Sequence, residues 1–242
     1  MRSAERTEQH GGSVILYDPG LADAVDERWF DRLHWDGAAA APGYAGGRGA
    51  TLFIHCGAHD CVLRHYHRGG RIASVASDGF FWLGEPRTRS FREWRLLARM
   101  TAAGLPVPRP FAARYVRRGL VYRADLMTVL IPEIAPLSTV LGRGGAGADL
   151  WERVGACIAR FHAAGFCHAD LTAHNLQVSS AGEVFLLDFD RGSERDARGS
   201  WCAGNLARLR RSLAKISGEG DYHFDEGQWA ALMRGYAPAV SR

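Results

Sequence analysis

The sequence predicts an α+β chain of two lobes, in which a β-rich N-terminal lobe with one helix precedes a mainly helical C-terminal lobe. Short runs of β-branched and aromatic residues, separated by glycine-containing turns, occupy most of residues 51–131. A helical pattern interrupts them after Ser90, and helical periodicity dominates beyond residue 149. With 47% hydrophobic residues among 242, the chain has ample apolar material for a buried core.

The N-terminal lobe is expected to span residues 14–132, after a polar tail, residues 1–13, that we expect to be disordered. Ser90 is the predicted N-cap of its single helix, because Glu93 follows three residues later and Gly104 can end the helix. Two antiparallel hairpins flank this helix in the sequence. Their strands are predicted at residues 51–56 and 61–67, and at residues 110–116 and 120–131.

The C-terminal lobe is expected to span residues 133–242. Residues 131–150 contain two prolines and a glycine cluster, so we interpret them as a linker at which the chain can hinge near residue 132. Asp149 is the predicted cap of the next helix, which ends at Gly165. A strand and two helices follow, at residues 184–190, 201–217 and 224–236.

Charge and cysteine content narrow the class of protein. Thirty Lys and Arg residues against 26 Asp and Glu residues give a net charge of +4, so we expect no nucleic-acid partner, while an anionic partner stays open. The five cysteines are far apart and form no CxxC pair, which argues against a disulfide framework and favours a reducing cytosol. The N-terminus has no secretory h-region, and no apolar run approaches the length of a membrane span.

The clearest chemical signal lies between the helices of the C-terminal lobe. His168, Asp170 and Asn175 form an HxDxxxxN pattern, and Asp188 follows in a DFD turn. This order resembles the catalytic loop and metal-binding turn of the protein-kinase-like fold. Phosphoryl transfer needs a carboxylate to accept the proton of the attacking hydroxyl, and oxygen ligands to hold Mg²⁺ on the phosphates. Asp170 is the candidate for the first task, and Asn175 and Asp188 are the candidate metal ligands.

Each of these residues also has a structural alternative. Asp170 could be a loop or capping aspartate, Asn175 a left-handed turn residue, and Asp188 a strand-end aspartate paired with an arginine. The FHAAG sequence at a helix end and the apolar strand before DFD favour the functional interpretation. His162 and His168 fit structural roles better than a zinc site, because the chain has no HExxH motif and no compact His/Cys set.

From about Ile15 to Tyr236 the chain resembles the lipopolysaccharide kinase family of the protein-kinase-like fold. The resemblance is carried by CVLRHYHRGGRI, EPRTRSFREWRLL, HADLTAHN and DFDRG. It implies ATP and Mg²⁺ as cofactors, and phosphorylation of the 4-hydroxyl of the 3-deoxy-D-manno-octulosonic acid (Kdo) sugar of a Kdo-lipid A precursor. It also implies an enzyme in peripheral contact with the cytoplasmic face of a bacterial inner membrane.

The resemblance also assigns nucleotide contacts to the N-terminal lobe. Gly46, Gly47 and Gly49 could cover phosphates through backbone N–H groups. An equally open alternative is that they form a flexible turn. Arg64 stands where kinases carry a phosphate-pairing lysine, and Glu93 stands where the next helix offers its carboxylate partner. This lobe has no lysine, and arginine keeps the charge with a different geometry. A helix-cap role for Glu93 and a surface role for Arg64 are the alternatives.

Candidate acceptor contacts lie beside the same loop. His174 and Arg191 are candidate substrate residues, although His174 could equally face solvent. An anionic sugar and lipid A phosphates would suit the arginines near the site, for which ordinary surface is the alternative. These arginines are Arg68, Arg71, Arg87, Arg89, Arg191, Arg195 and Arg198. The stripe of apolar residues 206, 209, 213 and 216 among arginines could lie on a membrane or belong to the core.

Two other functions stay open on the sequence. GLPVPRPF after the N-terminal helix suggests a small-molecule kinase of the aminoglycoside or choline kinase type. The missing lysine and the partial glycine loop suggest a catalytically silent kinase-like binding module. The complete set of Asp170, Asn175 and Asp188 favours an active enzyme over the silent module.

Overall fold

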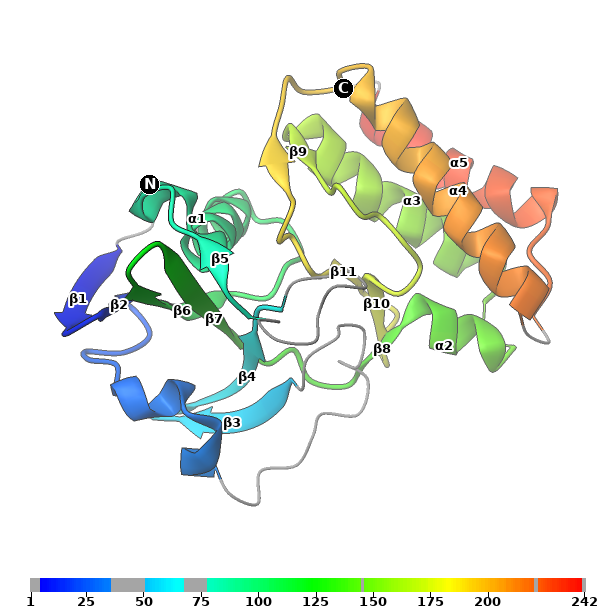
Figure 1. Cartoon of the computed structure of the whole chain (residues 1–242). Coiled ribbons are helices and arrows are strands. Elements are labelled where there is room, and N and C mark those ends of the chain that lie inside the picture. Colours follow the sequence, from blue (N-terminus) through cyan, green and yellow to red (C-terminus); the bar gives the residue numbers. More distant parts are fainter. Residues whose placement is uncertain (1–4, 36–50, 68–77, 145, 220–221, 241–242) are drawn as a thin grey trace. The chain divides into compact units, whose positions relative to one another are not determined.

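The structure is a computed structural model that describes residues 5–35, 51–67, 78–144, 146–219 and 222–240. The chain divides into two compact units, the first made of residues 1–102 and 108–131 and the second of residues 103–107 and 132–242. Antiparallel sheet dominates the first unit and helices dominate the second, so the predicted α+β class is confirmed (Figure 1).

Among the described residues, the first unit contains one seven-stranded antiparallel sheet. Six strands follow the order β1-β2-β6-β7-β4-β3, and β5 pairs with β7 off this path. The strands are β1 (Arg6–His10), β2 (Ser13–Tyr17), β3 (Leu52–Cys56), β4 (His59–His65), β5 (Phe80–Phe81), β6 (Pro110–Arg118) and β7 (Val121–Val129). Both predicted hairpins are confirmed, as β3–β4 and β6–β7. The expected disorder of residues 1–13 is wrong for residues 6–10, because β1 pairs with β2 along its whole length.

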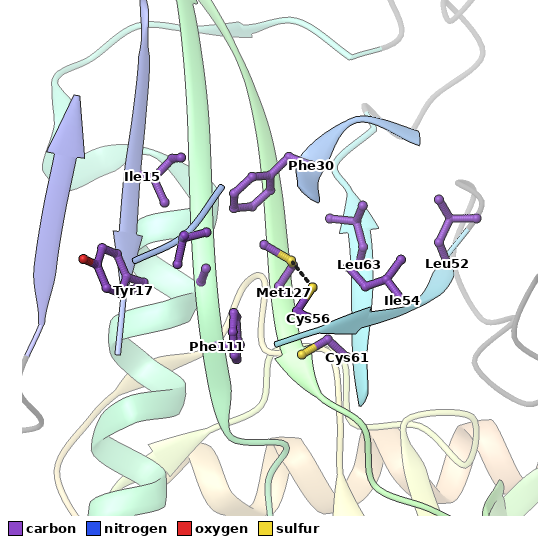
Figure 2. Close-up of a cluster of buried hydrophobic side chains, with 12 residues drawn as sticks. Ile15, Tyr17, Phe30, Leu52, Ile54, Cys56, Cys61, Leu63, Phe111 and Met127 are labelled. Carbon is purple, nitrogen blue, oxygen red and sulfur yellow. Dashed lines mark hydrogen bonds between the residues drawn. The ribbon is translucent and has the colours of Figure 1, made fainter. Parts of the chain in front are cut away.

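The two faces of this sheet have different partners. Tyr17, Ala112, Met127 and Leu63 align across neighbouring strands, so they share one face. This face forms a buried cluster with Phe30 of the 3-10 helix η1 (Glu27–Phe30), as Figure 2 shows. The short helix η2 (Arg32–Trp35) follows, and its Trp35 packs against the same cluster.

Helix α1 (Arg89–Ala102) packs against β6 and β7. Ala113, Leu126 and Arg64 align in the register, one residue out of step with the cluster above, so Arg64 lies on the opposite face. The short helix η3 (Glu85–Arg87) precedes α1. The predicted N-cap is wrong, because Ser90 lies inside α1 and its hydroxyl donates to the carbonyl of Arg114.

The second unit joins three long helices to short strands (Figure 1). Its elements are β8 (Ile134–Pro136), α2 (Leu137–Gly142), α3 (Ala148–Ala163), β9 (Phe166–Cys167), β10 (Leu176–Ser179), β11 (Val184–Leu186), β12 (Ser193–Glu194), α4 (Trp201–Glu219) and α5 (Glu226–Val240). Residues 131–150 are therefore not simply a linker, because β8 pairs with β10 and α2 follows it. The predicted cap at Asp149 is also wrong, since Gly147 is the N-cap of α3. The two predicted C-terminal helices are confirmed as α4 and α5.

Helices α3 and α5 cross with their backbones in contact. A Cβ atom on Gly155 of α3 would overlap the backbone carbonyl of Leu232, and one on Gly235 of α5 would overlap the carbonyl of Glu152. Only glycine allows such a close approach at both positions. The crossing therefore fixes the register of α5 against α3.

Among the described residues, no helix has both the length and the hydropathy that a membrane crossing needs.

Candidate active site

The loop that follows β9 is held from the inside by His168. This imidazole is buried, and burial lowers its pKa, so the neutral ring is the relevant form. Its Nε2 lies 2.8 Å from the carbonyl oxygen of Leu187, and its Nδ1 accepts the backbone N–H of Asp170 at 3.1 Å. A neutral ring with its proton on Nε2 satisfies both contacts. His168 thus ties the start of the Asp170 loop to the residue before Asp188, as the structural role predicted for it requires.

Asp188 is fixed through its neighbour. The backbone N–H of Leu187 donates to the carbonyl of Asn175 at 3.0 Å, while its own carbonyl binds His168. Both backbone groups of Leu187 are therefore bonded to the loop. Asp188 is exposed and has φ of 65°, a left-handed conformation that is uncommon for residues other than glycine and is concentrated at functional sites. The left-handed residue considered at Asn175 thus occurs at Asp188 instead.

A hydrogen bond orients the side-chain amide of Asn175. Its Nδ2 donates to the backbone carbonyl of Asp170 at 2.8 Å, so the amide oxygen is the atom left to act as an acceptor or ligand. Asp188 supplies a carboxylate. Among the described residues, His, Cys, Asp and Glu form no cluster of three that could hold a metal ion. Mg²⁺ needs only one or two carboxylates when phosphate oxygens and water complete its shell, so this donor set fits Mg²⁺ bound with a nucleotide.

A polar face of α4, which was not predicted from the sequence, supports the loop. Asn205, Arg208 and Ser212 are spaced three and four residues apart, so they lie on one side of the helix. Asn205 Nδ2 donates to the carbonyl of His168 at 2.6 Å, and Ser212 Oγ accepts the N–H of Ala173 at 3.2 Å. The signal that could have found them is polar residues at helical spacing beside the buried Leu209 and Leu213.

Arg208 contacts the candidate base directly. Its Nε donates to Asp170 Oδ1 at 2.8 Å, and its Nη2 forms an ion pair with the same oxygen. The other carboxylate oxygen of Asp170 has no such contact with Arg208. Arg208 therefore orients the carboxylate while one oxygen remains available for a hydroxyl proton. About half of each side chain is exposed, as a group that meets a substrate requires.

A chain of buried polar contacts connects this loop to α5. Burial lowers the pKa of His162, so its ring is neutral. Its Nε2 lies 3.1 Å from Asn205 Oδ1, and its Nδ1 lies 2.9 Å from the hydroxyl of Tyr236. A proton on Nε2 makes the ring a donor to Asn205 and an acceptor from Tyr236. Asn205 then continues to the carbonyl of His168, and this confirms the structural interpretation of His162.

The candidate acceptor residues lie on the surface of the same unit. His174 is exposed, and its Nδ1 lies 2.9 Å from the hydroxyl of Ser138 on α2. Arg191 is exposed in the turn after Asp190, which closes with a 2.8 Å bond from the N–H of Gly192 to the carbonyl of Phe189.

In the first unit, Arg64 and Glu93 form a hydrogen-bonded ion pair. Glu93 is buried, with 2% of its side chain exposed, whereas 27% of Arg64 is exposed. The hydroxyl of Tyr66 donates to the same Glu93 oxygen at 2.6 Å, and burial together with the Glu93 charge raises the pKa of Tyr66. The helix-cap alternative for Glu93 is wrong, because this carboxylate faces the sheet. In this pair the buried carboxylate of Glu93 holds the guanidinium of Arg64.

Some of the predicted residues fall outside the described part of the chain, and others belong to the core. Gly46, Gly47 and Gly49, like Arg68 and Arg71, lie outside the described residues. The apolar stripe of α4 belongs to the core, since Leu206, Leu209 and Leu213 are buried. The membrane alternative for that stripe is therefore wrong.

Comparisons with known proteins identify the family of the chain. Residues 34–236 match the model of the lipopolysaccharide kinase (Kdo/WaaP) family. The chain is 41% identical to the 3-deoxy-D-manno-octulosonic acid kinase of Xylella fastidiosa strain M12. It is 42% identical to the proteins of that name from Stenotrophomonas maltophilia strain K279a and Xanthomonas axonopodis pv. citri strain 306. Each match spans 235 residues, 97% of this chain and 94% of the relative. A match of this extent shows that the protein belongs to the lipopolysaccharide kinase (Kdo/WaaP) family.

Proposed function

We propose that the chain is a 3-deoxy-D-manno-octulosonic acid kinase that transfers the γ-phosphate of ATP to the 4-hydroxyl of the Kdo sugar of a Kdo-lipid A precursor, in lipopolysaccharide core biosynthesis. The observation that carries the proposal is the rigid connection of Asp170, Asn175 and Asp188 through His168 and Leu187. The names of the relatives support the acceptor. We further propose a protein-kinase-like arrangement of two lobes, residues 14–132 and 133–242.

In the proposed reaction Asp170 is the general base. The acceptor hydroxyl oxygen forms a bond to the γ-phosphorus as the bond from that phosphorus to the β–γ bridging oxygen breaks, and ADP leaves. The hydroxyl proton passes to the Asp170 oxygen that Arg208 does not hold. Arg208 acts by keeping the carboxylate in one orientation.

Asn175 and Asp188 are the proposed ligands of Mg²⁺. Bound there with ATP, Mg²⁺ would neutralise the charge that develops on the phosphate oxygens. The left-handed backbone of Asp188 and the hydrogen bond from Asn175 to the Asp170 carbonyl fix the two ligand groups relative to the base. Because these groups are positioned before substrate binds, little reorganisation is needed during the reaction.

Arg64 is the proposed cation for the nucleotide phosphates, with Gly46, Gly47 and Gly49 as backbone donors. The contacts of the guanidinium with Glu93 and Tyr66 are both made by Nη2, and a guanidinium carries five N–H donors that suit phosphate oxygens. A guanidinium binds phosphate through two parallel hydrogen bonds, so arginine can take this position in place of a lysine.

His174 and Arg191 are the proposed contacts to the acceptor. Arg191 offers a cation for the carboxylate of Kdo, and His174 offers a ring nitrogen that Ser138 orients. Since the acceptor is a lipid, we place the enzyme in peripheral contact with the cytoplasmic face of the bacterial inner membrane.

The test is transfer of radiolabelled phosphate from ATP to purified Kdo-lipid A in detergent micelles, with and without Mg²⁺. We expect a single phosphate per Kdo, located at the 4-hydroxyl by nuclear magnetic resonance. Aminoglycosides and choline serve as competing acceptors. Transfer to these and none to Kdo-lipid A would contradict the proposed acceptor, and the absence of any nucleotide turnover would contradict the enzyme itself.

A further inference from the structure

Exposed apolar side chains gather at one end of the N-terminal sheet. Five large hydrophobic side chains are exposed in the part of the chain that the structure describes, and four of them come from β5, the residues after it, and the turn into β7. These four are Phe81 (68% exposed), Leu83 (65%), Leu120 (78%) and Val121 (41%), which we call the apolar tip. Single exposed leucines are ordinary, but a contiguous apolar surface marks an interaction site.

Strand pairing brings the members of the apolar tip together. Phe81 lies opposite Val121 in the β5–β7 pair, and the N–H of Trp82 donates to the carbonyl of Leu120 at 2.9 Å. Paired residues point to the same face of a sheet. The other face of these strands is occupied by Phe80 and Tyr122, which are buried with ring centroids 5.6 Å apart. The core therefore uses one face, and the apolar tip is on the face that it leaves exposed.

Arginines lie beside the apolar tip. Arg118 lies opposite Val121, and Arg123 lies two residues after Val121, so both share its face. Arg87 is exposed after Leu83. Two carboxylates lie nearby, and one of them neutralises Arg123, so Arg118 and Arg87 are the cations on which the argument depends. Asp78 pairs with Arg123 at 2.8 Å, and Glu85 accepts the hydroxyl of Tyr115 at 3.0 Å.

We propose that the apolar tip is the surface by which the enzyme binds an anionic lipid bilayer, with Phe81 and Leu120 entering the interface and Arg118 meeting lipid phosphates. Exposed apolar side chains beside arginines match the layered chemistry of such a membrane, in which charge lies outside and hydrocarbon inside. The surface comes from a hairpin turn and an edge strand, which can enter a bilayer surface without opening the core. This deepens the proposed function and rests on it, because it names the contact that brings the site to a lipid acceptor.

The first experiment measures sedimentation of the protein with vesicles of phosphatidylethanolamine and phosphatidylglycerol. Wild-type protein should bind these vesicles and bind vesicles of phosphatidylcholine alone at least about tenfold more weakly. The double variant Phe81→Ser/Leu120→Ser should lose about tenfold or more in affinity for the anionic vesicles, because it removes two insertable side chains. Leu33→Ser is the matched control, since Leu33 of η2 is also 78% exposed but lies outside the apolar tip.

A second pair of variants tests the charges. Arg118→Glu should weaken binding to anionic vesicles by about tenfold, whereas Arg211→Glu, the same change on an exposed residue of α4, should leave it nearly unchanged. Equal losses for the two variants would mean that only net charge matters, and would overturn the proposal. Vesicle binding that the double variant retains would overturn it too.

Two further measurements separate membrane binding by the apolar tip from dimer formation and from the proposed function. Light scattering that shows a wild-type dimer, and a monomer for Phe81→Ser/Leu120→Ser, would assign the surface to a second copy of the chain and overturn the membrane proposal. With Kdo-lipid A in detergent micelles, the double variant should keep the turnover of the wild type. Binding that depends on the apolar tip, without phosphate transfer to Kdo-lipid A, would support this surface while contradicting the proposed function.

Discussion

Replacing Arg64 by alanine tests the ion pair of the first unit, where the chain departs from the usual kinase pattern. The change leaves the Glu93 carboxylate buried, with the hydroxyl of Tyr66 as a remaining donor. Removing one partner of a fully buried pair costs about 3–5 kcal/mol. Arg64 is 27% exposed and Tyr66 remains, so we expect a loss of about 2–3 kcal/mol in the free energy of unfolding. The Michaelis constant for ATP should rise as well, because the phosphates lose a cation.

Glu93→Gln completes a double-mutant cycle with Arg64→Ala. The glutamine amide can still accept from Tyr66, and the freed guanidinium can turn to water, so this change alone should cost about 1 kcal/mol. Added to Arg64→Ala it should cost nothing further, since the uncompensated charge is gone, which gives a coupling of at least about 1 kcal/mol. Urea unfolding followed by circular dichroism measures all four proteins.

Arg95 of the same helix provides the control for this cycle. Arg95 forms an exposed pair with Glu5, so Arg95→Ala should cost less than about 1 kcal/mol and leave ATP binding unchanged. Arg64→Lys should recover part of the stability and part of the ATP affinity, because an ammonium keeps the charge without the planar fork. Additive losses at Arg64 and Glu93 would show that the two residues act separately and would refute the reasoning.

Three other outcomes are expected. Asp170→Ala should lower turnover about 100-fold or more with little change in the Michaelis constant for ATP. Arg208→Ala leaves the base in place but no longer orients it, so turnover should fall about tenfold. Steady-state assays measure both. Asp188→Gly should abolish phosphate transfer and weaken the binding of magnesium and ATP measured by calorimetry. The variant should unfold no more easily than the wild type, because glycine suits φ of 65°, and easier unfolding would contradict this. A hydrogen bond and the charge of Asp125 raise the pKa of His65, so its stabilising effect is present below pH about 6.5 and is lost as pH rises through the folded pKa. His65→Gln should therefore lower the urea midpoint more near pH 6 than near pH 9, and an equal loss at both would contradict the linkage.

Local sequence pattern was sufficient to predict the hairpins, and it also singled out the candidate catalytic loop. Alternating apolar residues around a glycine turn define β3–β4 and β6–β7, because the information for a hairpin lies within a few residues. The spacing of Asp170 and Asn175 is local in the same sense. Predictions failed where the structure depends on partners that are distant in the sequence. Glu93 has the spacing of a capping residue, but its partner lies on β4, 29 residues earlier.

Residues 131–150 show the same limit in another form. Their prolines and glycines are typical of a linker, but three of them form β8 because β10, far along the chain, offers hydrogen bonds. Arg208 could not be assigned to Asp170 from the sequence, since a helical arginine beside apolar residues is equally typical of a solvated face. Tertiary pairing decides such positions, and local propensity does not.

The glycine crossing of α3 and α5 has a consequence for the order in which the protein matures. The ribosome synthesises the Asp170 loop before it synthesises α5, and domains fold as units during synthesis. Until α5 seats against Gly155, the hydroxyl of Tyr236 is absent from the ring of His162, and the route through Asn205 to the His168 carbonyl is incomplete. A nascent chain would thus hold the candidate loop through α4 alone, and the support from Tyr236 would be added only when α5 has formed.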